Sequence, residues 1–114
     1  MAKESNEQPS FVVLSVYNCS PELRQKYVEL MQEFVETQVL VRPGLCAFDL
    51  FTDEGGERIV TLARWRDRKA FEEFKQSEVG RDAAEVGLVL RPTVYFLRPE
   101  TTLADTTASF PIAS

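Results

Sequence analysis

Arg58-Ile59-Val60-Thr61-Leu62-Ala63-Arg64-Trp65 is followed directly by Arg66-Asp67-Arg68-Lys69-Ala70-Phe71-Glu72-Glu73-Phe74. The first half predicts a strand, on which Thr61, Ala63 and Trp65 share one face by the two-residue period. The second half predicts a helix, because Phe71 and Phe74 share one face by the three-to-four-residue period. The only tryptophan of the chain therefore ends a strand and faces a helix. This spacing is typical of a small pocket, and equally of a tryptophan that only fills the core.

The rest of the chain predicts the element order β-α-β-β-α-β. Ser20-Pro21-Glu22 is a strong helix start, with an N-cap residue, a proline at the first helical position and an early acid. That helix should run to about Gln38, and Thr52 to Glu57 should form a hairpin loop. The other expected elements are strands at 11–17, 45–51 and 92–97 and helical pieces at 69–75 and 81–86. We expect a disordered segment at 1–10, one domain at 11–99 and a tail or arm at 100–114.

Composition excludes several classes of function. A chain of 114 residues supports one domain, and its net charge of −5 argues against nucleic acid as a partner. No apolar run approaches the roughly 20 residues of a membrane span. The first eight residues are polar and lack the apolar core of an export signal, so we expect a cytoplasmic protein with no membrane partner. Cys19 and Cys46 lie outside any CxxC pattern, which makes a metal or redox role weak.

The chain contains no histidine. This removes the commonest general base near neutral pH and the commonest protein ligand of zinc and iron. The five glycines form neither a GxGxxG nor a P-loop motif, so nucleotide binding by those motifs is excluded too. We therefore expect no metal site and no cofactor, and any chemistry must use the remaining polar side chains or the substrate itself.

The expected element order is that of an α+β, ferredoxin-like fold, in which an antiparallel sheet carries its helices on one face. In this topology the third strand separates the first from the second, which places Cys19 and Cys46 about 10 Å apart, beyond disulfide reach. The strands carry apolar residues on both faces, as in Val12, Leu14 and Val16 against Val13 and Tyr17. Because such a sheet must be covered on both sides, we expect a homodimer that packs sheet to sheet.

Three segments of the chain resemble the antibiotic biosynthesis monooxygenase family, whose members are small dimeric α+β-barrel proteins. They are Arg42-Pro43-Gly44-Leu45, Ala63 to Phe71 and Pro92 to Pro99. The resemblance implies a cavity between helices and sheet, in which a phenolic or polyketide-like aromatic molecule is oxygenated without metal or flavin. An electron-rich phenolate or enolate can itself give an electron to oxygen, so the protein need only deprotonate it, hold it and stabilise charge.

The resemblance also implies site residues. Trp65 matches the pocket tryptophan of the oxygenating members and Arg81 matches their arginine, so both are candidate catalytic residues. The candidate substrate-binding residues are Thr61, Phe71, Phe74, Tyr27 and Tyr95. Independently of the resemblance, Tyr17, Tyr27 and Tyr95 are possible proton donors or acceptors. Oxygenating members carry an asparagine where this chain has Thr61, and some carry a tyrosine where it has Phe71. The haem-degrading branch needs a histidine, so that activity is excluded.

Asp49 is a third candidate catalytic residue. If the hairpin pairs Thr52 with Arg58, Asp49 lies opposite Thr61 on the face of Trp65, where it could act as a base. The alternative is that Asp49 lies on an edge strand and faces water.

The leading hypothesis for the whole protein is a tailoring monooxygenase that binds a small-molecule substrate. The alternatives are a cyclase or isomerase using the same pocket, or a dimer that binds an apolar ligand without changing it.

Overall fold

Four antiparallel strands form one sheet in the order β2-β3-β1-β4. They are β1 (Phe11–Asn18), β2 (Leu45–Thr52), β3 (Arg58–Trp65) and β4 (Thr93–Leu97). The computed structural model describes residues 9–88, 90–101 and 103. Most of the expected N-terminal segment, and the tail beyond 103, therefore lie outside the described residues. The expected fold class is confirmed, because the order alternates strands and helices as a ferredoxin-like α+β fold requires.

The helices are α1 (Pro21–Phe34), α2 (Arg68–Gln76) and α3 (Glu78–Leu88). A short π-helix, η2 (Val35–Val39), continues α1, so the helical segment runs to about the predicted residue. The helix expected at 81–86 begins earlier, at Glu78, because the Gly80 N–H donates to the Ser77 hydroxyl at 3.1 Å and caps its start. Ser20 occupies the N-cap of α1 as predicted, but its side chain makes no capping hydrogen bond.

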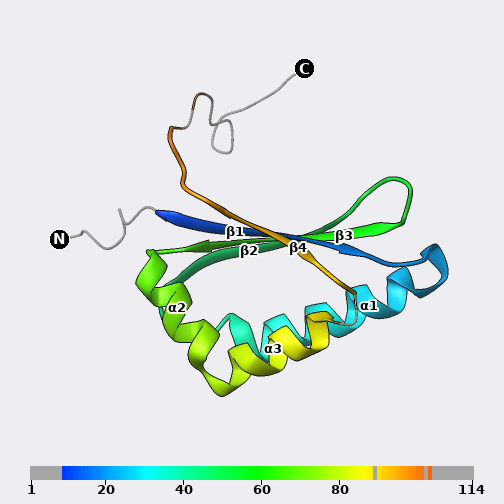
Figure 1. The fold of residues 1–114 in the computed structure, drawn as a ribbon, viewed down its shortest axis with the longest axis horizontal. Helices are drawn as coiled ribbons and strands as arrows, with labels where there is room; N and C mark the ends of the chain where they lie inside the picture. Colours follow the sequence, from blue (N-terminus) through cyan, green and yellow to red (C-terminus); the bar gives the residue numbers. More distant parts are fainter. Residues whose placement is uncertain (1–8, 89, 102, 104–114) are drawn as a thin grey trace.

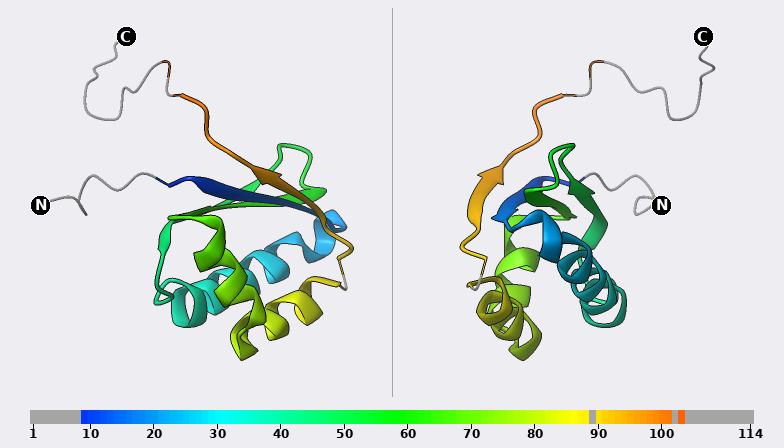
Figure 2. Two further views of the ribbon diagram at one scale, coloured as in Figure 1. Left: turned by 60° about the vertical axis from the view of Figure 1, so that its left-hand side comes forward. Right: turned by 90° about the vertical axis from the view of Figure 1, so that its right-hand side faces the viewer.

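The molecule has two layers, with all three helices on one face of the sheet (Figure 1). The two further views show the same arrangement, and the opposite face carries no helix (Figure 2). The core lies between the layers, at the end of β3 that meets α2. Its buried members are Phe11, Val13, Ala63, Trp65 and Ala70. The sheet face that carries Trp65 is thus the covered one.

From Ala47 to Thr52 the pairing of β2 with β3 differs from the expected register by one residue, and a β-bulge separates this stretch from the Leu45–Trp65 pair. Thr52 lies opposite Ile59, and Asp49 lies opposite Leu62. The expected pairs, Thr52 with Arg58 and Asp49 with Thr61, are therefore wrong. The hairpin closes with the Asp53 N–H donating to the Arg58 carbonyl at 3.2 Å, which keeps Thr52 inside the ladder. Since side chains alternate across a strand, the one-residue change moves Asp49 to the face without helices.

The strand order has a consequence for the cysteines. The third strand separates the first from the second as expected, and Cys19 and Cys46 form no disulfide with each other.

No helix in the described part of the chain is long and apolar enough to cross a membrane. The edge strand β4 is exposed along its whole length, and its four apolar residues Val94 to Leu97 are each at least 43% exposed.

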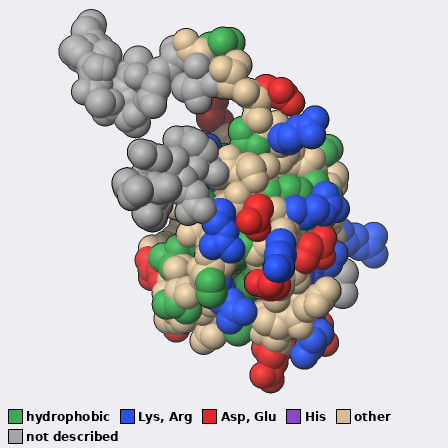
Figure 3. Space-filling model, turned by 90° about the vertical axis from the view of Figure 1, so that its left-hand side faces the viewer, with side chains coloured by type: hydrophobic (Ala, Val, Ile, Leu, Met, Phe, Trp, Pro, Cys, Tyr) green, Lys and Arg blue, Asp and Glu red, His purple; other side chains and the backbone are tan. Residues whose placement is uncertain are grey.

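Acidic and basic side chains are interspersed over the end of the molecule where α2 lies (Figure 3). Two of the ion pairs there join Arg66 to Asp67 at 3.3 Å and Arg68 to Glu72 at 3.5 Å. Such exposed pairs each contribute at most about 1 kcal/mol to stability. This surface is therefore of mixed sign, without the single-sign patch that binds a polyanion.

Candidate active site

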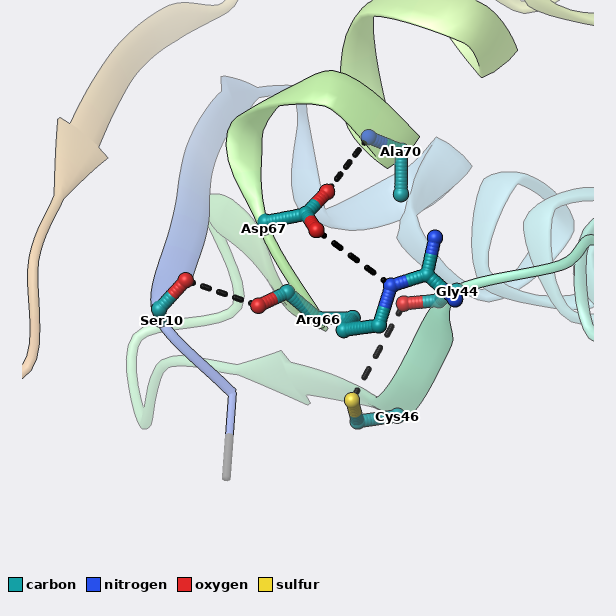
Figure 4. A network of polar contacts seen from close by, with 6 residues as sticks. All are labelled: Ser10, Gly44, Cys46, Arg66, Asp67 and Ala70. Carbon is teal, nitrogen blue, oxygen red and sulfur yellow. Dashed lines mark hydrogen bonds and ion pairs between the residues drawn. The ribbon is translucent and has the colours of Figure 1, made fainter. Parts of the chain in front are cut away.

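The junction between β3 and α2 is fixed by the Asp67 carboxylate. Its Oδ1 accepts from the Ala70 N–H at 2.8 Å, and its Oδ2 accepts from Arg66 Nε at 3.3 Å (Figure 4). The hydrogen bond from the Ala70 N–H, with the Arg66 charge, holds the pKa of Asp67 below its usual value, against the opposing effect of desolvation. Ser10 also stabilises the junction, since its hydroxyl donates to the Arg66 carbonyl at 2.7 Å. The chain therefore turns from strand to helix within two residues of Trp65.

Gly44 lets the chain before β2 lie against the first turn of α2. Its φ of +85° is in the left-handed region, and a Cβ there would lie 2.5 Å from the Ala70 Cβ. The Arg66 N–H donates to the Gly44 carbonyl at 2.7 Å, which holds this approach. The Pro-Gly dipeptide before the strand therefore positions α2 directly over the end of β3, beside Trp65.

Trp65 is surrounded by aromatic rings. It is 2% exposed, and its ring centroid lies 5.3 Å from that of Phe74 and 5.9 Å, edge-on, from that of Phe71. Phe11 extends the cluster, at 5.5 Å from Phe71. Trp65 is thus a core residue, which is one of the two interpretations that the strand-to-helix spacing allowed. Trp65 also lines a pocket, which is the other of those two interpretations.

The pocket lies between the sheet and the helices and has a volume of about 670 Å³. Its floor comes from β1 and β3, one end is closed by Trp65, Phe71 and Phe74, and α1, η2 and α3 form the walls. Most of its lining is apolar or aromatic, which is typical of a site for a small organic ligand. Glu33 and Asp82 are both exposed, so the pocket opens to solvent where they line it.

The π-helical turn η2 contributes a wall of this pocket. Val35, Thr37, Gln38 and Val39 all line it, and Val39 is only 4% exposed. The Leu40 N–H donates to the Val35 carbonyl at 2.9 Å, one residue further back than in an α-helix. The wider turn changes the direction in which the following side chains point, so the periodicity of α1 does not predict this wall.

The buried polar groups of the pocket are few. Thr61 is 7% exposed and lines the floor. The indole Nε1 of Trp65 is fully buried and has no hydrogen-bond partner in the described part of the chain. A buried donor without a partner costs free energy, which a ligand oxygen in the pocket would recover.

Five of the eight residues predicted for the site line this one pocket: Trp65, Thr61, Phe71, Phe74 and Tyr27. Three do not. Asp49 lies on the other face of the sheet, where its Oδ2 accepts from Arg64 Nη1 at 2.9 Å. Tyr95 lies opposite Leu14 on that same face and is 49% exposed. Arg81 is exposed and outside the lining, and its Nη1 donates to the Gln76 carbonyl at 2.7 Å.

Other lining residues were not among the predicted ones. Glu33 on α1 and Asp82 on α3 bring carboxylates to the pocket, while Ser15 brings a hydroxyl from β1, beside Tyr17, which the sequence had marked only as a possible proton donor or acceptor. The alternation of β1 places Ser15 on the same face as Tyr17, so Ser15 could have been found. The carboxylates could not, because each lies on a helix whose rotation about its own axis is set by packing. No group of three or more acidic or cysteine side chains in the described residues could hold a metal ion.

Fold and pocket together define a class: a ferredoxin-like α+β domain with an aromatic-walled pocket for a small organic molecule. A family model described as antibiotic biosynthesis monooxygenase matches residues 10–86. Because the match spans more than half of the chain, the protein belongs to the antibiotic biosynthesis monooxygenase family. The resemblance seen in the sequence is thereby confirmed.

Solved structures share this fold at low sequence identity. The monooxygenase ActVA-Orf6 of Streptomyces coelicolor, crystallised with nanaomycin D, is 20% identical with a TM-score of 0.78, over 92% of this chain and 100% of that one. SnoaB, a cofactor-independent oxygenase from Streptomyces nogalater, is 15% identical with a TM-score of 0.65, over 85% of this chain and 99% of that one. Rv0793 from Mycobacterium tuberculosis is 21% identical with a TM-score of 0.70, over 82% and 98%. A search of curated proteins found no match.

Proposed function

We propose that the protein is a tailoring enzyme that oxygenates a phenolic or polyketide-like aromatic molecule without a metal or flavin. The observation that carries this proposal is the pocket of about 670 Å³ whose closed end is made by Trp65 and two phenylalanines. Aromatic walls favour a flat aromatic ligand through stacking and edge contacts. Family membership, and the oxygenases among the solved structures of the same fold, support the same reaction class.

The proposed reaction needs only the substrate, oxygen and a proton acceptor. For an anthrone-like ring system, loss of a methylene proton gives an enolate that passes one electron to O₂. The resulting radical and superoxide combine into a peroxide anion, which takes a proton back to become a hydroperoxide. Loss of water then leaves a ketone in place of the methylene group. One oxygen atom enters the product and the other leaves as water, so the step requires no external reductant. The protein contributes orientation and stabilisation of the enolate charge.

The pocket offers groups for both tasks. The Trp65 N–H, which has no hydrogen-bond partner in the described residues, is the donor for the developing oxyanion. Glu33 and Asp82 are the carboxylates of the described lining, and one of them accepts the proton. Asp49 and Arg81 take no part, because neither lines the pocket. Phe71 has no proton to exchange, so its role is limited to the aromatic wall.

We also infer a homodimer formed through the sheet face that carries no helix. The support is the apolar surface on that face, where Phe51 is 50% exposed, Tyr95 49% and Leu97 43%. Leu14, Val16, Val60 and Leu62 continue the patch across the two central strands. Exposed apolar surface of this extent marks an interaction site, and a second copy of the sheet matches its shape.

Oxygen uptake tests the proposed function. The purified protein is mixed with anthrone in air-saturated buffer containing EDTA, and oxygen is followed with an electrode while the ketone product is quantified. We expect uptake of one O₂ per anthrone above the uncatalysed rate, with one ¹⁸O atom from ¹⁸O₂ in the product. Binding of anthrone without faster uptake would contradict the enzyme and favour the second candidate, a protein that only binds its ligand. Phe71 and the exposed Arg81 are the observations that favour that candidate.

A further inference from the structure

Two hydroxyls lie side by side in the middle of the pocket floor. Ser15 of β1 and Thr61 of β3 are directly opposite each other in the antiparallel ladder, and both line the pocket. Side chains of directly opposite residues have Cβ atoms about 5 Å apart. Both side chains are more than nine-tenths buried, at 8% and 7% exposure. Neither hydroxyl oxygen is among the fully buried polar atoms without a partner in the described residues.

The fold does not require polar residues at these two positions. In the same row across the sheet, Val94 of β4 lies beside Ser15, and Leu50 of β2 lies beside Thr61. An apolar pair would continue this row, whereas Ser15 and Thr61 give the pocket floor two hydrogen-bonding groups. The pair therefore needs another explanation, and the pocket above it supplies one.

The space over the pair is kept open by small residues. Ala63 is the next residue along the floor, and Ala83 and Gly87 of α3 line the opposite wall. Thr61 and Trp65 share a strand face four residues apart, so the hydroxyl pair lies about 13 Å from the closed end of the pocket. That span accommodates a flat ligand of about three fused rings between Trp65 and the hydroxyls.

The charge of the lining limits what the hydroxyls can bind. Its charged members within the described residues are the acids Glu33 and Asp82, and it contains no lysine or arginine. A carboxylate or phosphate on the ligand would be repelled there and would find no counter-ion. A carbonyl or phenol oxygen is neutral and has two lone pairs, which is enough for two hydroxyl donors.

We infer that Ser15 is a ligand-binding residue, and that it and Thr61 together hydrogen-bond one neutral oxygen on the side of the ligand that faces away from Trp65. This inference rests on the proposed function to the extent that an aromatic ligand occupies the pocket. It adds the site of polar recognition and the chemical class of the group recognised. Neither hydroxyl exchanges a proton, so both residues act by orienting the ring system.

A pair of probes that differ in one oxygen tests this inference. 9-Fluorenone and fluorene have three fused rings each, and only fluorenone carries a carbonyl. Equilibrium dialysis measures the affinity of each for the wild type, Ser15→Ala and Thr61→Val. Loss of one hydrogen bond should weaken fluorenone binding about three- to tenfold in each variant and leave fluorene binding unchanged. Thr52→Val is the matched control, because Thr52 is an exposed threonine on the same sheet face and outside this pocket.

The possible outcomes separate the two proposals. If the wild type binds fluorenone, and Ser15→Ala and Thr61→Val bind both probes with unchanged affinity, the hydroxyl inference is wrong and the aromatic pocket stands. If the wild type binds neither probe, both proposals fail. Thr61→Val keeps the side-chain shape, so it decides the question even where Ser15→Ala lowers stability. Fluorenone-4-carboxylate should bind the wild type more weakly than fluorenone, and equal affinity would contradict recognition of a neutral group.

Discussion

The Asp49 carboxylate and the Arg64 guanidinium form an ion pair of 2.9 Å on the sheet face that carries no helix. Asp49 has one apolar neighbour opposite it, Leu62, and Phe51 follows it on the same face. In the isolated chain both side chains are 40–47% exposed, so the pair contributes little to stability. In a sheet-to-sheet dimer the same pair would be removed from water, and loss of one partner would leave the other charge buried.

We therefore predict that Asp49→Ala weakens the dimer about tenfold or more, and that it leaves ligand affinity in the pocket unchanged. Sedimentation equilibrium measures the first effect and equilibrium dialysis the second. Glu72→Gln, which breaks the exposed Arg68–Glu72 pair on α2, is the control and should leave the dimer unchanged. A monomeric wild-type protein at micromolar concentration would contradict the dimer itself.

Trp65 and Arg81 should respond differently to substitution. Trp65→Phe keeps an aromatic ring in the core and removes the indole N–H, so we expect turnover about tenfold lower with the fold retained. Trp65→Ala should cost about 3–5 kcal/mol of stability as well, because the residue is fully buried. Arg81→Ala serves as the control, since Arg81 is exposed and outside the pocket lining. Equal losses in Trp65→Phe and Arg81→Ala would show that the site is misplaced.

The carboxylates of the pocket account for proton removal in the proposed reaction. We predict that the double variant Glu33→Gln/Asp82→Asn lowers kcat by about 100-fold or more, the usual contribution of a positioned base. The two single variants then identify which carboxylate accepts the proton. Asp53→Asn, in the β2–β3 hairpin, is a control outside the pocket. An unchanged kcat in the double variant would show that the substrate loses its proton before it binds.

The Asp67 cap makes stability depend on pH. The pKa of its carboxyl is lower in the folded protein than in a free aspartic acid, because the charged form accepts from the Ala70 N–H. A lowered folded-state pKa gives stability that is present above the unfolded pKa and is lost as pH falls through the folded value. Asp67→Ala should therefore lower stability by about 0.5–2 kcal/mol at pH 7, and by less below pH 3. Urea unfolding at both pH values measures this, and an equal effect at both would contradict a charged cap.

Gly44 offers a test of the contact that positions α2. Gly44→Ala places a methyl group against Ala70 Cβ at a backbone φ of +85°. We expect destabilisation of more than about 1 kcal/mol from the left-handed conformation and the contact together. Gly55→Ala is the matched control, because a Cβ there has no atom within 4 Å. Equal melting temperatures for the two variants would show that the loop before β2 adjusts freely.

The sequence alone predicted the elements and their order. Strand alternation and helical periodicity are local properties, and Ser20-Pro21, Pro43-Gly44 and the polar hairpin mark the chain reversals. The order β-α-β-β-α-β then leaves few topologies, and the observed strand order follows from it. The aromatic end of the pocket was predictable for the same reason, since Trp65, Phe71 and Phe74 lie within ten residues of one another.

The rest of the site depended on contacts between distant segments. One residue of register between β2 and β3 decided that Asp49 faces away from Trp65, and the hairpin geometry sets that register. The π-turn at Val35–Val39 and the packing rotation of α3 decided that Val39 and Asp82 line the pocket and that Arg81 does not. Pairing of β1 with β3 set Ser15 opposite Thr61. Local periodicity determines which residues share a face of a strand or helix. Only tertiary packing determines which other elements contact that face.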